Sequence, residues 1–85
     1  MYYFYVIKSI KLGKCYYGFT NNLKRRLFEH NRGKSSYTKS AKPWILVYYE
    51  AYASKVDAQV REKNIKLRKQ AYTLLRKRIK RSIES

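Results

Sequence analysis

The stretch GKCYYGFTNNLKRRLFEH, residues 13–30, contains a strand and a helix in direct succession. CYYGFT at 15–20 is built from aromatic and β-branched residues of the kinds that favour strands. LKRRLFEH at 23–30 spaces its two leucines four residues apart, as a helix with one apolar face does. Asn21 or Asn22 can accept backbone amide hydrogen bonds as the N-cap of that helix. A strand that leads directly into a helix predicts a fold that mixes both elements.

Strand-forming residues recur on both sides of this stretch. YYFYVIK at 2–8 is separated from 15–20 by SIKLGK, whose glycine suits a turn, so the two segments are expected to pair as a hairpin. The first helix is expected to end near Gly33. The small, polar and basic segment KSSYTKSAKP at 34–43 is expected to be an exposed loop, and WILVYYEAY at 44–52 a third strand.

Two further helices are expected in the rest of the chain. Ser54 and Asp57 have capping-box spacing and open a helix that should continue through residue 70. A last, basic helix is expected at about 71–82. The prediction is one domain over residues 1–85 of α/β (α+β) class, with a central three-stranded antiparallel sheet flanked by helices in the order β-β-α-β-α-α.

The charge of the chain points to a polyanionic partner. Its 21 Lys+Arg against 5 Asp+Glu give a formal net charge of +16, so a nucleic acid, DNA or RNA, is the first candidate. One cysteine and no Cys/His cluster leave no disulfide and no zinc site, which favours a cytoplasmic location. The longest apolar runs are far shorter than the roughly 20 residues that cross a bilayer, so no membrane association is expected. The sequence names no protein partner.

The first helix carries two polar residues beside its apolar face. Arg26 and His30 border that face because they are four residues apart, whereas Arg25 points outward and can pair with Glu29. Two interpretations of His30 stay open. It is either a packing residue with satisfied hydrogen bonds or a group that takes part in a reaction.

The tyrosines of the hairpin are a second set of candidates. Strand alternation places Tyr3 and Tyr5 on one face of the first strand and Phe4 on the other, and Tyr5 and Tyr16 are expected close together across the hairpin. Most of the ten tyrosines are explained simply as strand-forming core residues. A phenol, with a pKa of about 10, becomes a usable base only where nearby positive charge stabilises the phenolate.

Elimination among the acidic residues leaves two carboxylates. Glu29 is expected to pair with Arg25, Asp57 caps a helix and Glu84 lies in the terminal tail, which leaves Glu50 and Glu62. Glu62 lies at the margin of an apolar helix face, and one carboxylate is enough to hold one magnesium ion together with substrate phosphate. The alternative is that Glu62 forms an ion pair with Lys66, four residues later.

These residues, in this order, resemble the GIY-YIG nuclease domain. Its two signature tripeptides correspond to Tyr3-Phe4-Tyr5 and Tyr16-Tyr17-Gly18, with Tyr3, Phe4 and Tyr17 departing from the signature. NLKRR at 22–26 and AQVREKNIK at 58–66 resemble the segments that carry the family's catalytic arginine and metal-binding glutamate. KSSYTKSAKPWILVYYE at 34–50 is similar to the small stand-alone bacterial members, which also resemble the amino-terminal domain of the excinuclease C subunit.

The resemblance implies a DNA endonuclease that depends on one divalent metal ion, Mg²⁺ or Mn²⁺. A tyrosine, Tyr5 or Tyr16, would take a proton from the attacking water with the help of His30. Arg26 would stabilise the charge that forms at phosphorus, and Glu62 would bind the metal. The alternative from another class is a non-catalytic nucleic-acid-binding module that uses basic helices and surface tyrosines.

Basic residues outside this set are candidates for phosphate contacts. Residues 63–81 contain nine Lys+Arg and no acid, with Leu75 and Ile79 spaced to anchor one helix face. Six phosphate contacts would give log K a slope of roughly −5 against log salt. The simpler explanation is a solvated basic face. The candidate contacts are Lys24, Arg25, Lys34, Lys39, Lys63, Lys66, Arg68, Lys69, Arg76, Lys77 and Arg78.

Overall fold

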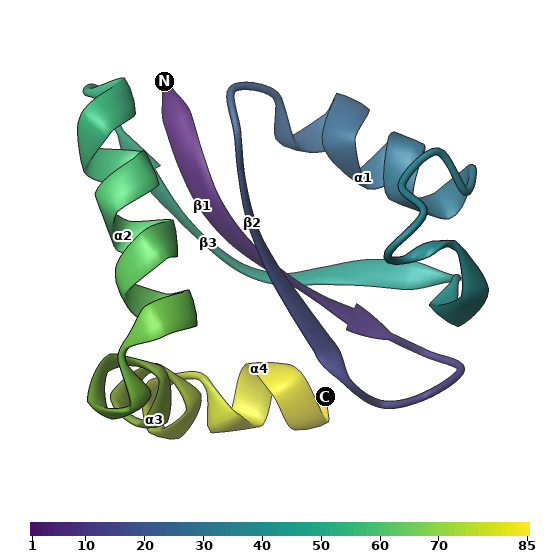
Figure 1. Cartoon of the computed structure of the whole chain (residues 1–85). Helices are drawn as coiled ribbons and strands as arrows, with labels where there is room; N and C mark the ends of the chain where they lie inside the picture. Colours follow the sequence, from purple (N-terminus) through teal and green to yellow (C-terminus); the bar gives the residue numbers. More distant parts are fainter.

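The computed structural model describes residues 1–85 and confirms the expected α+β fold class. Figure 1 shows the chain from the amino-terminal strand to the short carboxy-terminal helix. The elements in chain order are β1 (Tyr2–Ser9), β2 (Cys15–Thr20), α1 (Leu23–Asn31), a 3-10 turn η1 (Lys39–Ala41), β3 (Trp44–Tyr52), α2 (Lys55–Leu67), α3 (Lys69–Arg78) and α4 (Lys80–Glu84).

The three strands form an antiparallel sheet in the order β2-β1-β3, so β1 is central and the other two are edge strands. The hairpin register pairs Tyr5 with Gly18 and Ile7 with Tyr16. Gly13 makes the turn between β1 and β2 with φ +74°, a conformation that glycine adopts without steric cost. The outer side of β2 therefore carries a row of backbone groups that no strand of this sheet pairs.

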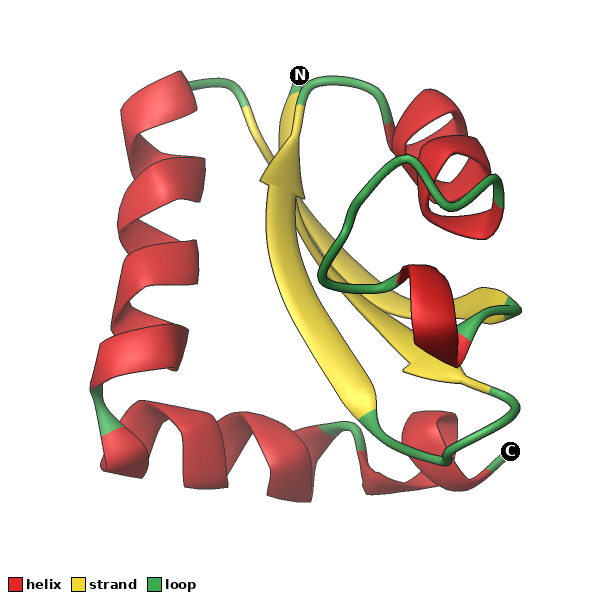
Figure 2. Ribbon diagram, turned by 45° about the vertical axis from the view of Figure 1, so that its right-hand side comes forward, coloured by secondary structure: helices red, strands yellow, loops and turns green.

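Each face of the sheet packs against a different group of helices. Phe4 and Val6 point to one face, where they are buried with Ile65, Leu75, Ile79 and Ile83 of the last three helices. Tyr5 and Ile7 point to the other face and are buried with Ala41 and Trp44. Figure 2 shows α2 on one side of the sheet and α1 with the 3-10 turn on the other. The expected placement of Tyr5 opposite Phe4 is confirmed.

Both expected helix N-caps are present. The Asn22 side chain accepts a hydrogen bond from the Arg25 amide at 3.0 Å and starts α1. The Ser54 hydroxyl accepts one from the Asp57 amide at 3.4 Å and starts α2. None of the four α-helices has the length and the apolar character that a bilayer crossing requires.

The expected ends of the later helices are wrong. Helix α2 stops at Leu67 rather than residue 70, because Arg68 is extended (φ −115°, ψ 110°) and turns the chain into α3. The expected helix at 71–82 is two helices, α3 and α4, with the break at Ile79 (φ −108°, ψ 21°). This break bends the chain along the sheet and lets Leu75, Ile79 and Ile83 all reach the core.

The loop over 34–43 also differs from the expectation. It is not uniformly exposed, since it contains the 3-10 turn and buries Thr38 and Ala41. The indole nitrogen of Trp44 donates a hydrogen bond to the Thr38 carbonyl at 2.9 Å, which fixes the loop against the start of β3. This packing positions Thr38 for the site described next.

Candidate active site

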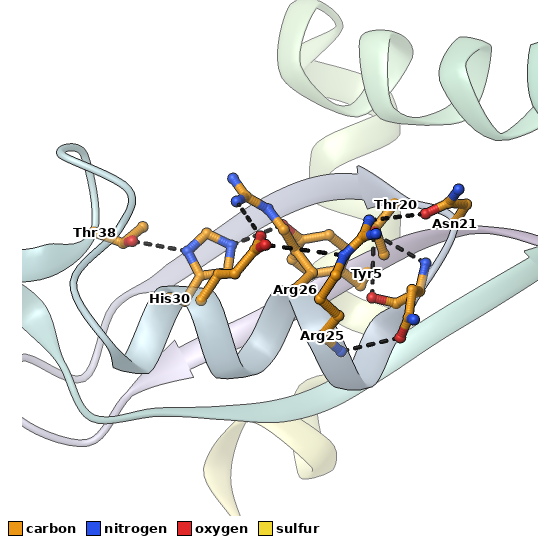
Figure 3. Close-up of polar contacts among 9 residues, drawn as sticks. Tyr5, Thr20, Asn21, Arg25, Arg26, His30 and Thr38 are labelled. Atoms are coloured by element: carbon orange, nitrogen blue, oxygen red, sulfur yellow. Dashed lines mark hydrogen bonds and ion pairs between the residues drawn. The ribbon is translucent and has the colours of Figure 1, made fainter.

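A chain of hydrogen bonds crosses the buried face beneath α1. His30 lies in the last turn of helix α1, and its side chain is fully buried. Its Nε2 lies 2.8 Å from the Tyr5 hydroxyl on β1, and its Nδ1 lies 2.8 Å from the Thr38 hydroxyl in the loop. Figure 3 shows His30 between these two partners. The three side chains come from three separate segments, so the fold itself builds this arrangement.

His30 is uncharged at physiological pH. The pKa of its imidazole is lowered from 6.5 to about 4, mainly by burial and in addition by the positive charge of Arg26. A neutral imidazole has one donor and one acceptor nitrogen. In one tautomer Tyr5 donates to Nε2 and Nδ1–H donates to Thr38. In the other, Thr38 donates to Nδ1 and Nε2–H donates to the Tyr5 oxygen, which is the arrangement that stabilises a phenolate.

Other candidate residues act on the pKa of the Tyr5 phenol. Its pKa is raised from 10.0 to about 12, mainly by burial, with the neighbouring Arg26 guanidinium acting to lower it and the nearby Tyr16 and Glu62 acting to raise it. Arg26, Tyr16 and Glu62 therefore all lie within electrostatic reach of the same hydroxyl. Without additional positive charge, this phenol stays protonated at neutral pH.

Gly18 allows the Tyr5 ring to lie across the neighbouring strand. Tyr5 is paired with Gly18 in the hairpin register. A Cβ atom at position 18 would overlap the Tyr5 hydroxyl and Cζ and lie 2.8 Å from Cε2. Any side chain there would push the ring away, so glycine is required for the contact between Tyr5 and His30 rather than for a backbone turn.

The two adjacent arginines of α1 have different surroundings, but their acidic partner differs from the expectation. Glu29 pairs most closely with Arg26, at 3.1 Å, whereas its distance to Arg25 is 3.9 Å. Residues three and four positions earlier both reach Glu29 on a helix, and Arg25 is instead held by Asn21 at 3.0 Å. Arg26 is half-buried, pairs with Glu29 and lies within electrostatic reach of the Tyr5 phenol.

The Tyr16 ring joins the histidine to helix α2. Its centroid lies 5.3 Å from that of His30, and the Tyr5 centroid lies 5.9 Å from the same imidazole. The two tyrosines thus contact one histidine, which confirms that they lie close together. The ammonium group of Lys66, on α2, lies over the Tyr16 ring, 5.2 Å from its centroid, in a cation–π contact.

Of the two carboxylates that the sequence left open, only Glu62 is available to a metal ion. Glu50 accepts hydrogen bonds from Tyr48 at 2.6 Å and Tyr52 at 2.5 Å, and from Arg61 at 2.9 and 3.1 Å. These donors hold the pKa of Glu50 below its usual value despite its burial, and they leave no free position for a metal.

Glu62 has one partner. Its carboxylate pairs with Lys66 at 3.1 Å, as the alternative interpretation of this residue expected. The Glu62 side chain is 26% exposed and lies within electrostatic reach of Tyr5. A carboxylate whose one ion-pair partner is a partly exposed lysine can exchange that partner for a cation. No group of three or more His, Cys, Asp or Glu forms a preassembled metal centre, so a single carboxylate is the available ligand.

The candidate phosphate contacts are almost all accessible. Ten of the eleven are exposed, and Arg76 is half-buried because it donates a hydrogen bond to the Tyr17 hydroxyl at 3.1 Å. They come from several elements. Lys24 and Arg25 lie on α1, Lys34 and Lys39 lie in the following loop, and the others lie on α2 and α3 or between them.

Two residues that organise this site were not among the sequence candidates. Thr38 had no signal, because its contact with His30 depends on the path of the loop. Gly18 had one, since a glycine within an aromatic strand marks close approach of another group, and here that group is Tyr5.

The order and spacing of these residues agree with a known family. The family model described as "GIY-YIG catalytic domain" matches residues 1–80. The chain belongs to the GIY-YIG family. This membership gives it a nuclease-type domain, with Tyr5, Tyr16, Arg26, His30 and Glu62 gathered as described above.

Its relatives are small bacterial proteins. The UPF0213 protein of Bacillus pumilus is 43% identical over 65 residues, which is 75% of this chain and 65% of that protein. The UPF0213 protein of Staphylococcus haemolyticus is 43% identical over 65 residues, 75% of this chain and 78% of its own length. A third, from Clostridium perfringens, is 43% identical over 67 residues, 78% of this chain and 71% of that protein. The chain thus spans just under two thirds of the B. pumilus protein. No solved structure matches the chain.

Proposed function

We propose that this domain is a DNA endonuclease that hydrolyses a phosphodiester bond with the help of one divalent metal ion. The observation that carries the proposal is the convergence on one phenol. Tyr5 is hydrogen-bonded to His30 and lies within electrostatic reach of Arg26, Tyr16 and Glu62. A net charge of +16 supplies the attraction for a phosphate backbone.

Each side chain has a defined role in this proposal. A tyrosine, Tyr5 or Tyr16, accepts a proton from the water that attacks phosphorus in line with the departing oxygen. His30 in its Nε2–H tautomer donates to the Tyr5 oxygen and stabilises the phenolate that the reaction needs. Arg26 contributes fixed positive charge to the phosphoryl oxygens as negative charge accumulates there. The same guanidinium opposes the rise in the Tyr5 pKa, so it also favours the base form of that phenol.

The residues present fit one hard cation such as Mg²⁺ or Mn²⁺. Magnesium is commonly held by one or two carboxylates together with substrate phosphate, and Glu62, whose one ion-pair partner is Lys66, is the carboxylate within electrostatic reach of Tyr5. When bound, the ion supplies positive charge at the phosphate and at the departing 3′ oxygen. The ammonium group of Lys66 must leave Glu62 for the ion to bind, and it is then free to contact phosphate.

Nicking of supercoiled plasmid DNA with Mg²⁺ or Mn²⁺ tests the proposal. Glu62→Gln and Arg26→Gln should each lower the rate by about 100-fold or more, because each removes charge that acts on the transition state. Glu84→Gln is the matched control, since it makes the same change at an exposed residue at the end of α4. Equal rates for wild type and for Glu62→Gln and Arg26→Gln would remove the proposal.

One observation favours a second candidate, a non-catalytic nucleic-acid-binding module. The exposed basic residues extend over α1, α2 and α3. Most of them lie outside the Tyr5 cluster, by which we mean Tyr5, Tyr16, Arg26, His30 and Glu62. Binding of DNA or RNA in EDTA, unchanged in Glu62→Gln, together with no nicking by wild type would favour this candidate. A nucleic-acid substrate and a single cysteine also lead us to propose a cytoplasmic location.

A further inference from the structure

A groove runs from the candidate active site along the free edge of β2. Its volume is about 720 Å³, within the range of pockets that hold small organic molecules. Strand β2 forms one wall, and the end of α2 with the start of α3 forms the other. The lining residues are Cys15, Tyr16, Tyr17, Tyr37, Ile65, Lys66, Leu67, Arg68, Lys69 and Tyr72.

The groove and the candidate active site share two side chains. Tyr16 lies against His30 on one side and is a wall of the groove on the other. Lys66 lies over the Tyr16 ring and pairs with Glu62 while it lines the groove. A group bound in the groove would therefore lie next to a phosphate bound at the Tyr5 cluster.

Aromatic rings that the fold leaves accessible line the groove. Tyr37 is 81% exposed, and its ring packs at 5.5 Å from that of Tyr16. Tyr72 is 37% exposed and meets Tyr17 edge-on at 5.6 Å, while Leu67 beside them is 72% exposed. Burial in the domain core does not account for these side chains. Apolar groups gathered in one exposed groove are characteristic of a binding surface.

The charged residues that line the groove are all cationic. Lys66, Arg68 and Lys69 line it, and none of its ten lining residues is acidic. Arg76 adds a guanidinium group 5.7 Å from the Tyr72 ring and donates to the Tyr17 hydroxyl. Exposed aromatic faces between cationic groups are the chemistry that holds single-stranded nucleic acid, with bases stacked on rings and phosphates on cations.

We propose that this groove is a stacking subsite for an unpaired nucleobase that adjoins the phosphate at the Tyr5 cluster. The placement of that phosphate rests on the proposed function, whereas the subsite itself rests on the groove. Bases within a continuous duplex are already stacked on one another and cannot enter a groove of this shape without being unpaired. The domain would therefore favour DNA in which the nucleotide beside the bound phosphate is unpaired.

A nucleobase fits these observations better than an extended peptide. The free edge of β2 could add a peptide strand, and that mode of binding relies mainly on backbone hydrogen bonds. It gives no reason for tyrosines on both walls of the groove or for a lining without acid. A polyanionic strand with flat apolar rings accounts for both features.

Fluorescence anisotropy in EDTA tests the subsite without any cleavage. The probes are an oligothymidylate of about 12 nucleotides, a length that one small domain can cover, and a blunt duplex of the same length. Tyr37→Leu and Tyr72→Leu should each weaken oligothymidylate binding roughly 5-fold or more, because one stacking partner is lost. Duplex affinity should change less than twofold. The slope of log K against log salt should not change, because no charge is removed.

Tyr49→Leu is the matched control, since Tyr49 is 51% exposed on β3, outside the groove. Unchanged oligothymidylate affinity in the groove variants, equal losses on duplex, or an equal loss in Tyr49→Leu would overturn the subsite. Competition by polyglutamate as effective as that by oligothymidylate would also overturn it, in favour of a general polyanion or acidic peptide surface. Binding is measured without metal, so failure of the nicking assay would leave this result unaffected.

Discussion

The Tyr5 hydroxyl lies 2.8 Å from Nε2 of His30, the one histidine of the chain, and both side chains are buried. The imidazole is neutral in this position, so it bridges two hydroxyl groups instead of carrying charge. Any proton that Tyr5 gives up or receives must therefore be accommodated by a neutral ring and by the Thr38 hydroxyl behind it.

Stability should depend on the titration of His30. The unfolded chain binds a proton at this imidazole near pH 6.5, whereas the folded protein binds it near pH 4. Between these values the unfolded state binds more protons, so the stability supplied by the neutral imidazole is complete above pH 6.5 and falls as the pH approaches 4. The expected loss is about 3 kcal/mol.

Because His30 is the one histidine of the chain, its pKa can be measured directly. The ring carbon–proton resonance of His30 in a two-dimensional NMR titration should show a midpoint near pH 4. Arg26→Gln should raise the midpoint, because it removes a positive charge that opposes protonation. A wild-type midpoint close to 6.5 would contradict the buried, neutral ring.

Thr38 should matter through the orientation of His30. Thr38→Val keeps the shape of the side chain but removes the hydroxyl, which leaves Nδ1 of a buried imidazole without its partner. We expect a loss of about 1–3 kcal/mol in the free energy of unfolding. We also expect kcat for nicking to fall by about 10-fold or more, because the Nε2–H tautomer that supports Tyr5 loses the hydroxyl that donates to Nδ1.

Thr38→Ser provides the comparison, because it retains the hydroxyl and should restore most of kcat. If the valine and serine variants have equal kcat values, the hydroxyl does not position His30. A change confined to KM in the valine variant would point to the same conclusion.

The parts of the fold that sequence predicts here are those set by neighbouring residues. The bounds of β3, an asparagine cap at Asn21 or Asn22, the cap at Ser54 and the buried positions of Leu75 and Ile79 all follow from alternation, capping chemistry or helical spacing. Each of these signals comes from residues that are close together in the sequence, so no knowledge of the tertiary structure is needed.

The features that sequence missed depend on tertiary contacts. The break at Ile79 is set by the sheet against which three aliphatic residues must pack. The preference of Glu29 for Arg26 over Arg25 depends on which guanidinium is drawn toward Tyr5. The candidate residues were found individually from pattern and family resemblance, but their convergence on one phenol required the path of every strand and helix.

Gly18→Ala should impair catalysis more than its effect on stability would suggest. The added Cβ overlaps the end of the Tyr5 ring, which must move away and lose its contact with His30. Overpacking of this kind costs about 1–3 kcal/mol. Thermal unfolding should still be cooperative, while nicking should fall by about 10-fold or more if Tyr5 acts as proposed.

Gly13→Ala is the control for that variant. Gly13 has φ +74° and no atom within 4 Å of an added Cβ, so alanine there introduces backbone strain without touching Tyr5. We expect about 1–2 kcal/mol of destabilisation with normal nicking. Similar activities for the two alanine variants at matched stability would show that the position of the Tyr5 ring is unimportant.

Lys66 should compete with metal for Glu62. Its ammonium group lies 3.1 Å from the Glu62 carboxylate, so a cation that binds there must first displace it. A partly exposed ion pair contributes about 0.2–1 kcal/mol, so Lys66→Met should tighten Mn²⁺ binding by roughly 1.5- to 5-fold. Electron paramagnetic resonance of free Mn²⁺ measures this affinity without DNA.

Lys63→Met removes the same charge from an exposed residue of α2 that has no ion pair, so it separates local competition from a change in net charge. Equal Mn²⁺ affinities in Lys66→Met and Lys63→Met, or Mn²⁺ binding that survives Glu62→Gln, would show that this carboxylate is not the metal ligand.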